Sequence, residues 1–334
     1  MRVAREKAIG RLQGESDPLV SVIIPAYNVS TYIYDTLASV LGQTLTDFEV
    51  ILVNDGSPDT EELEQAIQPF RSRIVYLTQE NKGPGAARNL GILHARGQYL
   101  AFLDGDDIWL PGYLDAQMRM FEERPSLEMV YSDARVFGDT PFSGKTYMEI
   151  CPSNGPVNFE SLVSERCQVI TSCTVVHQRI FAKCGLFDVE LHGTEDFHMW
   201  IRVAHGGAKI AYHRAVLGRY RIRSGSLSSS PGRMHLEFMR ALKKIENALS
   251  LSPERSSLVQ SQIERFQAEL ELELGKSYLF CGQVEQARQS LRKANVYFCK
   301  PKLWLVLMGL MLAPGLTRLS VKIWLGCKRG SKQL

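Results

Sequence analysis

Three carboxylates follow one apolar segment of the sequence. Residues 99–103 are apolar and rich in residues that favour strands, and Asp104, Asp106 and Asp107 come shortly after them. A strand that ends in this way places its carboxylates at the edge where open α/β sheets bind ligands. Crowded carboxylates repel one another, and Mg²⁺ or Mn²⁺, which prefer oxygen ligands, would relieve that repulsion. The alternative is a solvated turn, because Asp and Gly favour turns anyway.

Two other loops carry polar groups that suit a nucleotide. Asp55 ends a predicted strand, where its carboxylate could accept hydrogen bonds from a base or ribose, or cap the following turn. Residues 81–89 form a Gly-rich loop that opens a helix, and helix N-termini favour anions. Lys82 and Arg88 could therefore face a diphosphate, or belong to an ordinary solvated helix start. The spacing is not that of a Walker loop.

Asp196 and a group of arginines complete the candidate site. Asp196 lies in the first turn of a helix expected over 195–204, where it could cap the helix or act as a general base. Arg219, Arg221 and Arg223 alternate, so they share one face of an extended segment. Arginines suit phosphate recognition, and a basic rim that serves solubility is the alternative. The seven histidines show no spacing typical of metal ligands.

The elements that must position these residues alternate between strand and helix. Such alternation predicts β-α-β units and a mainly parallel sheet whose loops converge on one edge. Strands are expected over 19–25, 48–53, 74–77, 99–103, 129–132 and 171–177, and helices over 31–41, 59–70, 83–95 and 113–123. Residues 137–159 and 220–230 are expected to be loops.

Changes in composition divide the chain into three predicted parts. Residues 1–17 are polar and basic and should form a flexible arm, whereas residues 18–230 form the α/β domain. After residue 230 helix-forming residues dominate, so 231–334 is expected to be a helical domain. Within it, residues 274–294 match the spacing of one tetratricopeptide-like hairpin, without a clear second copy.

Bulk composition narrows the class of protein. The 334 residues carry a formal net charge of +3, which is too mild to indicate nucleic-acid binding by itself. Seven cysteines, an odd number without a Cys-x-x-Cys pair, fit reduced thiols in the cytosol better than disulfides. The N-terminal residues do not resemble a signal peptide, and no run reaches the roughly 18 apolar residues of a membrane span. We therefore expect a cytoplasmic location.

The segment 303–325 is the most apolar part of the C-terminal region. It contains Trp304 and Trp324 among basic residues, and Pro314-Gly315 interrupts it. Basic residues with interfacial tryptophans suit a helix that lies on a membrane surface. The alternative is a pair of core helices that close the helical bundle. The first hypothesis predicts a peripheral contact with the cytoplasmic face of the membrane.

Five short motifs follow one another along the chain. They are Val22-Ile23-Ile24-Pro25-Ala26-Tyr27-Asn28, Val53-Asn54-Asp55-Gly56-Ser57, Gly85-Ala86-Ala87-Arg88-Asn89, Phe102-Leu103-Asp104-Gly105-Asp106-Asp107 and Glu195-Asp196-Phe197. As an ordered set they resemble the family 2 glycosyltransferases, over roughly residues 18–230. The resemblance implies the GT-A fold, which is an α/β fold with a Rossmann-like, mainly parallel sheet flanked by helices. Here a C-terminal α-helical extension would follow it.

The resemblance also assigns roles in binding a nucleotide-sugar. It implies that Pro25, Ala26 and Tyr27 line the base pocket and that Asp55 contacts the base. It places Arg88 on the side of the nucleotide phosphates. These five residues would form the donor half of the site.

The remaining implied roles concern the reaction. Asp104 is expected to contact the ribose or the sugar, and Asp106 to coordinate Mn²⁺ or Mg²⁺. Asp196 is implied as the general base that deprotonates the acceptor hydroxyl. A metal ion that offsets charge on the departing diphosphate, with a base on the opposite side, suits a single in-line displacement that inverts the anomeric centre.

One position departs from the family pattern. Relatives often carry His in a Tyr-Arg-x-His pattern, whereas this chain has Tyr220-Arg221-Ile222-Arg223. Because Arg cannot ligate a cation, Arg223 is expected to bind the diphosphate directly. A Gln-x-x-Arg-Trp motif, typical of processive synthases, does not occur in the sequence, which favours the addition of one sugar per encounter.

The leading hypothesis is a metal-dependent inverting glycosyltransferase that uses a UDP-sugar. Its acceptor would be a hydroxyl of a cell-surface glycan or of a lipid-linked molecule. A nucleotidyltransferase is one alternative, but it would need a Gly-rich loop directly after the first strand. A non-catalytic nucleotide-sugar-binding or scaffold protein is the other, and the intact Asp104, Asp106 and Asp196 argue against it.

Overall fold

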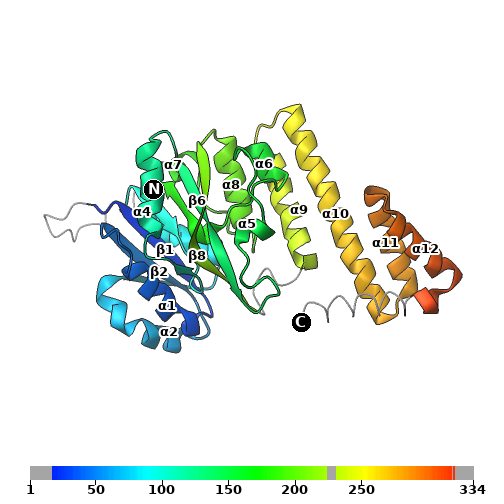
Figure 1. The fold of residues 1–334 in the computed structure, drawn as a ribbon, viewed down its shortest axis with the longest axis horizontal. Coiled ribbons are helices and arrows are strands. Elements are labelled where there is room, and N and C mark those ends of the chain that lie inside the picture. Colours follow the sequence, from blue (N-terminus) through cyan, green and yellow to red (C-terminus); the bar gives the residue numbers. More distant parts are fainter. Residues whose placement is uncertain (1–16, 224–230, 318, 320–334) are drawn as a thin grey trace.

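An eight-stranded sheet is the centre of the fold in the computed structural model, which describes residues 17–223, 231–317 and 319 (Figure 1). The strand order is β3-β2-β1-β4-β7-β6-β8-β5. The strands are β1 Val20–Ala26, β2 Phe48–Asp55, β3 Val75–Gln79, β4 Tyr99–Phe102, β5 Ile108–Trp109, β6 Met129–Gly138, β7 Thr174–His177 and β8 Ile210–Ile222.

Helices cover the sheet and continue beyond it. Those between the strands are α1 Ser30–Leu41, α2 Thr60–Ile67, α3 Pro84–His94, α4 Tyr113–Glu123, α5 Tyr147–Ile150, α6 Phe159–Val163, α7 Arg179–Cys184 and α8 Glu195–His205, with 3₁₀ turns over Gln68–Arg73 and Thr171–Cys173. The C-terminal helices are α9 Pro231–Ala248, α10 Pro253–Cys281, α11 Val284–Phe298 and α12 Pro301–Leu312. Within the described ranges, no helix combines the length and apolar character that crossing a bilayer requires.

The first half of the sheet has the parallel arrangement that the sequence predicts. β3, β2, β1 and β4 are parallel neighbours, joined by helices of the expected lengths. The second half is mixed, because β7 is antiparallel to both β4 and β6, β8 is parallel to β6, and β5 is antiparallel to β8. The α/β fold class is therefore confirmed, with a sheet that is parallel in one half and mixed in the other.

The predictions for the second half need correction. β6 continues to Gly138, well past the predicted end at residue 132, and β8 occupies part of the segment expected to be a loop from residue 220. The two strands pair along most of their length, with an irregularity in register around Asp133. That bulge breaks the alternation of apolar and polar residues by which a strand is recognised in a sequence. Two short helices, α5 and α6, also begin within the expected loop 137–159.

The central strands are buried on both faces. Val22 and Ile24 of β1 belong to the core beneath α1, whereas Ile23 between them belongs to a second core with Phe102 and Trp200. Successive residues of a strand point to opposite faces, so helices on both sides are needed to cover such a run. This packing fixes the C-terminal ends of the strands, where polar loops begin.

The C-terminal helices divide between two cores. Leu242 of α9 and Phe266 of α10 join the second core, which also contains Trp200 of α8. The later part of α10 packs with α11 and α12 around a separate small cluster that includes Leu291 and Leu310. Figure 1 shows α11 and α12 at the end of the molecule remote from β1 and β2. The division at residue 230 stays a prediction, since α9 shares its core with α8.

Candidate active site

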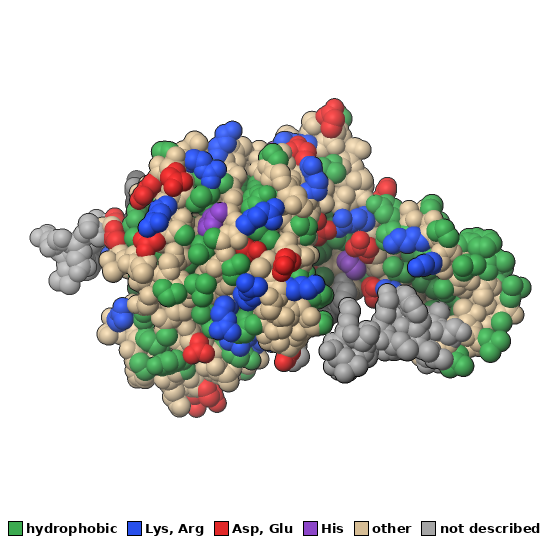
Figure 2. Space-filling view, in the orientation of Figure 1, with side chains coloured by type: hydrophobic (Ala, Val, Ile, Leu, Met, Phe, Trp, Pro, Cys, Tyr) green, Lys and Arg blue, Asp and Glu red, His purple; other side chains and the backbone are tan. Residues whose placement is uncertain are grey.

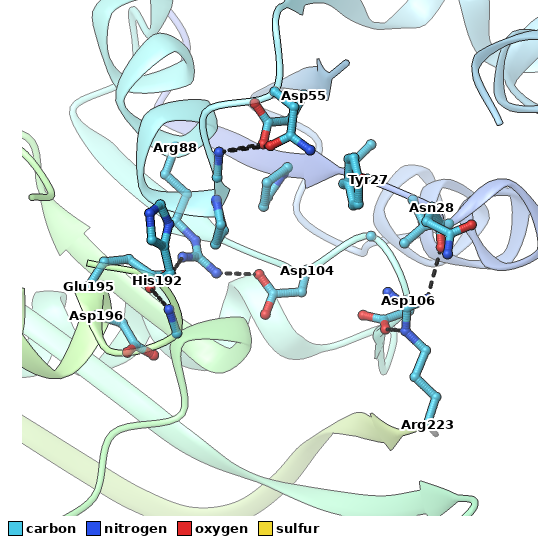
Figure 3. A pocket seen from close by; sticks show the side chains of 18 of the residues that line it. Tyr27, Asn28, Asp55, Arg88, Asp104, Asp106, His192, Glu195, Asp196 and Arg223 are labelled. Atoms are coloured by element: carbon cyan, nitrogen blue, oxygen red, sulfur yellow. Dashed lines mark hydrogen bonds and ion pairs between the residues drawn. The ribbon is translucent and has the colours of Figure 1, made fainter. Parts of the chain in front are cut away.

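A pocket of about 500 Å³ lies where β1, β2 and β4 end (Figure 3). Its walls include the nine residues to which we assigned a donor, metal or base role, which are Pro25, Ala26, Tyr27, Asp55, Arg88, Asp104, Asp106, Asp196 and Arg223. Lys82 and Arg221 also line it, whereas Arg219 and Asp107 do not. The fold thus brings into one pocket residues that are separated by almost 200 positions in the sequence, while the role of each stays a prediction.

Asp55 organises the wall formed by the Gly-rich loop. Its side chain is buried and accepts hydrogen bonds from Gln79 Nε2 at 2.6 Å, from the backbone N of Lys82 at 2.9 Å and from that of Gly83 at 2.8 Å. Gly83 has φ +88°, a conformation that favours glycine. The carboxylate therefore ties the end of β2 to the loop before α3, whatever it contributes to binding a base.

The loop between β1 and α1 forms the opposite rim. Tyr27 is 45% exposed and offers an aromatic face to a ligand. Asn28 has φ +53°, and its backbone N donates to Ser57 Oγ at 2.6 Å. Its carbonyl accepts a hydrogen bond from Arg223 Nη1 at 2.9 Å. The rim is thus fixed to both β2 and the end of β8.

Arg88 connects three walls of the pocket. It lies in α3, is only 4% exposed, and donates from Nη1 to Glu195 at 2.7 Å and from Nη2 to Asp104 at 2.6 Å. Burial alone would lower the pKa of Arg88, but the two carboxylates raise it overall, so it stays charged. Because both terminal nitrogens are engaged, Arg88 is a link within the wall and not a free cation that faces the pocket.

The other carboxylates of the acidic motif also face arginines. Asp106 pairs with Arg223, whose Nε lies 2.8 Å from Oδ2, and its carbonyl accepts from Arg221 Nε at 2.8 Å. The buried Asp107 accepts a hydrogen bond from the backbone N of Arg221 at 2.7 Å. Burial and the charge of Asp104 raise the pKa of Asp106, while Arg223 opposes the shift. An additional positive charge would therefore stabilise this cluster of carboxylates further.

These carboxylates could hold a divalent ion only if a bound substrate supplied further ligands to it. In the part of the chain that the structure describes, no group of three or more His, Cys, Asp or Glu side chains could hold a metal ion. Mg²⁺ and Mn²⁺, however, often bind through one or two carboxylates plus substrate phosphates. Asp106 can supply one such ligand, and Asp104 uses Oδ1 for Arg88, which leaves Oδ2 without a partner among the described residues. The diphosphate of a donor would have to complete the shell.

Asp196 lies across the pocket from Arg223, with Asp104 between them in Figure 3. It accepts hydrogen bonds from Thr171 Oγ1 at 2.9 Å and from the backbone N of Phe197 at 2.7 Å. Thr171 is itself held by a hydrogen bond from Trp200 Nε1 at 3.2 Å. Burial, and then the neighbouring Glu195, raises the pKa of Asp196 to about 6. Such a carboxylate is ionised at neutral pH and still has an appreciable affinity for a proton.

Two further residues that line the pocket, His192 and Arg233, were not predicted from the sequence. His192 precedes α8 and lies against the Gly-rich loop, where a Cβ on Gly83 would be 3.2 Å from its Nδ1. Arg233 reaches the pocket from the first turn of α9. His192 could have been found by extending the motif at 195–197 by three residues. Nothing in the local sequence relates Arg233 to the pocket.

The fold is that of the GT-A glycosyltransferases. Two solved structures resemble this chain in fold. Residues 1–349 of TarS from S. aureus match with a TM-score of 0.59 and 18% identity, over 83% of this chain and 80% of that one. The mannosyltransferase PcManGT from Pyrobaculum calidifontis, in complex with GDP-Man and Mn²⁺, matches with a TM-score of 0.61 and 16% identity, over 96% and 89%.

Sequence comparison gives the family. The model described as Glycosyl transferase family 2 matches residues 21–182. An uncharacterized glycosyltransferase of Methanocaldococcus jannaschii is 30% identical over 216 residues, which is 63% of this chain and 73% of that protein. Another, of Rickettsia felis, is 29% identical over 210 residues, or 62% of this chain, which thus spans about a third (35%) of that relative's length. The chain belongs to glycosyltransferase family 2.

Proposed function

We propose that this protein transfers a sugar from a UDP-sugar to a hydroxyl group, with inversion at the anomeric carbon. The observation that carries the proposal is the position of Asp196, with a pKa of about 6, in the same pocket as the predicted nucleotide residues. Inversion by one displacement needs a base on the side opposite the leaving group. The separation of Asp196 from Arg223 supports that arrangement (Figure 3).

The donor would occupy the half of the pocket between Asp55 and Arg223. Tyr27 offers a surface for the base, and Asp55 shapes the loop against which the nucleoside would rest. Arg223 is the predicted cation for the diphosphate. The choice of UDP is supported by TarS, whose structures include complexes with UDP and UDP-GlcNAc, whereas PcManGT was solved with GDP-Man.

The acceptor would approach from the side of Asp196. Thr171 and the backbone N of Phe197 orient the carboxylate, which would take the proton of the attacking hydroxyl as the new bond forms. When bound at Asp106, Mn²⁺ or Mg²⁺ would offset the charge that develops on the departing diphosphate. The complex of PcManGT with Mn²⁺ supports this part of the proposal.

We extend the proposal to the acceptor and to the place of the reaction. The acceptor is a cell-surface glycan or a lipid-linked intermediate, and one sugar is added per encounter. The C-terminal region would hold the enzyme at the cytoplasmic face of the membrane that carries the acceptor. Polysaccharide biosynthesis is the process that such a reaction serves.

The experiment combines a donor screen with one substitution. Thermal shifts with UDP-sugars and GDP-mannose, each with and without Mn²⁺, should identify the donor, because a ligand that binds the native state raises its Tm. Asp196→Asn should then lower transfer to acceptors in isolated membranes by about 10²- to 10⁴-fold. The Kd of the donor should change by less than about threefold, since Asp196 is proposed to act on the acceptor.

Asp35→Asn, an exposed carboxylate on α1, is the matched control and should leave both quantities unchanged. An equal loss of transfer and donor binding in Asp196→Asn would contradict the role of a base. If no nucleotide-sugar raised the Tm, the proposal as a whole would be wrong.

A further inference from the structure

The far end of the molecule carries an apolar face that no described part of the chain covers. On α12, Trp304 is 55%, Leu305 64%, Met311 53% and Leu312 79% exposed. Residues seven positions apart lie on the same side of a helix, so these four side chains form one stripe. In Figure 2, apolar side chains gather over the end of the molecule that α11 and α12 form. We call the stripe, together with Val296 of α11 (82% exposed), the terminal apolar face.

The opposite side of the same helix is buried. Leu307 and Leu310 pack with Leu291 and Leu279 in the small C-terminal core. α12 is therefore apolar on both sides but is covered on one. A helix that is apolar all round is ordinarily enclosed by protein or by lipid. Its twelve residues span about 18 Å, which is too short to cross a bilayer.

The sequence from residue 286 onward carries charge of one sign. Residues 286–334 contain ten Lys and Arg and no Asp or Glu, whereas residues 1–285 contain 29 basic and 36 acidic residues. Lys300 and Lys302 lie at the start of α12, are exposed, and have no carboxylate partner among the described residues. The net charge is therefore negative over residues 1–285, which contain the pocket, and positive over residues 286–334. A positively charged end with exposed apolar side chains is complementary to a surface that is negative outside and apolar beneath.

We infer that the terminal apolar face inserts into the headgroup region of an anionic lipid bilayer, with α12 lying in the plane of the membrane. The charges favour lipid over a second copy of the chain, because the sequence from residue 286 onward is basic in both copies and two such ends would repel each other. Trp304 has the amphipathic ring that membrane interfaces favour. This inference rests on the peripheral location proposed above, but not on any step of the transfer chemistry.

Co-sedimentation of the full chain with vesicles tests the inference. Vesicles of phosphatidylcholine alone should bind at least tenfold more weakly than vesicles with 30% phosphatidylglycerol, and 500 mM NaCl should weaken the second binding. The double substitution Trp304→Ser, Leu305→Ser should lower the partition coefficient at least tenfold, since it removes apolar area from the face. The double substitution Lys300→Ser, Lys302→Ser should lower the partition coefficient severalfold, and only for the anionic vesicles.

Matched controls come from exposed residues elsewhere. Leu93→Ser at the end of α3 is 68% exposed, and Arg119→Ser with Lys209→Ser removes two exposed charges; neither variant should change vesicle binding. The inference is overturned if the wild type binds neither vesicle, or binds both equally. It is also overturned if Trp304→Ser, Leu305→Ser dissociates a dimer seen by light scattering without changing vesicle binding. The donor-induced thermal shift should be equal in all variants, so a failure here is distinct from a failure of the proposed chemistry.

Discussion

The pocket and the terminal apolar face differ in how their charges are satisfied. In the pocket, Asp104 and Glu195 share the buried Arg88, and Asp106 pairs with Arg223, so that each of these five charges has a partner within 3 Å. At the other end, Lys300 and Lys302 are exposed and form no ion pair with a described carboxylate. The difference teaches that these pocket charges are satisfied by one another within the fold, whereas Lys300 and Lys302 remain available to a partner outside the described part of the chain.

The sharpest test of this comparison removes one charge from each end. Arg88→Met should lower the free energy of unfolding by about 3–5 kcal/mol, because it leaves the buried Glu195 without its partner. Lys302→Met should change it by less than about 0.5 kcal/mol. Urea unfolding followed by fluorescence measures both values.

A second substitution shows whether the loss of stability in Arg88→Met comes from the unpaired, buried carboxylate of Glu195. Adding Glu195→Gln to Arg88→Met should recover part of the lost stability, because the neutral amide is less costly to bury alone. Equal losses in Arg88→Met and Lys302→Met would remove the distinction between the two ends.

The next prediction concerns the pH dependence of transfer. A base acts only when deprotonated, and the pKa of Asp196 is about 6. The transfer rate at saturating donor should be constant above about pH 7 and fall about tenfold for each pH unit below 6. Vesicle binding through lysines should not change over pH 5–8, since their protonation is complete in that range. A transfer rate that is constant between pH 5 and 7.5 would contradict the assignment.

The smallest expected effect is on donor binding. Arg223→Gln should weaken UDP binding about tenfold, because a charge-assisted hydrogen bond to the diphosphate contributes about 1.5–3 kcal/mol. Arg219→Gln is the control, since Arg219 lies on β8 four residues before Arg223 and outside the pocket lining. Calorimetry measures both affinities, and no difference between the variants would mean that Arg223 serves Asp106 alone.

The sequence was most informative where local patterns were strong. β1, β2 and β4 are largely apolar runs that end in small or polar residues, and the parallel pairing follows from the alternation of strands with helices. The order of the strands was not predicted. The loops that follow these strands contain site residues, so the sequence alone could assign Asp55, Asp104 and Asp106 to one edge of the sheet. Each of these inferences needs only neighbouring residues.

Features that depend on distant partners were not predictable. The partners of Arg88 are 16 and 107 positions away, so the sequence could indicate a diphosphate contact but not the internal link. β8 was not predicted as a strand, apart from the extended arginines at its end, because a bulge and partly exposed arginines hide its alternation. The exposure of one side of α12 depends on what packs against the other, which spacing alone does not reveal.

The position of Arg88 has a consequence for building hybrid enzymes. The segment matched by the family model ends at residue 182, whereas one of the two carboxylates that hold Arg88 belongs to α8, beyond that limit. A hybrid that joins this chain's first 182 residues to another transferase must therefore supply an acidic side chain where Glu195 stands. Compatibility at that contact, together with the core shared by Phe102 and Trp200, would decide which relatives can exchange the part of the chain that follows residue 182.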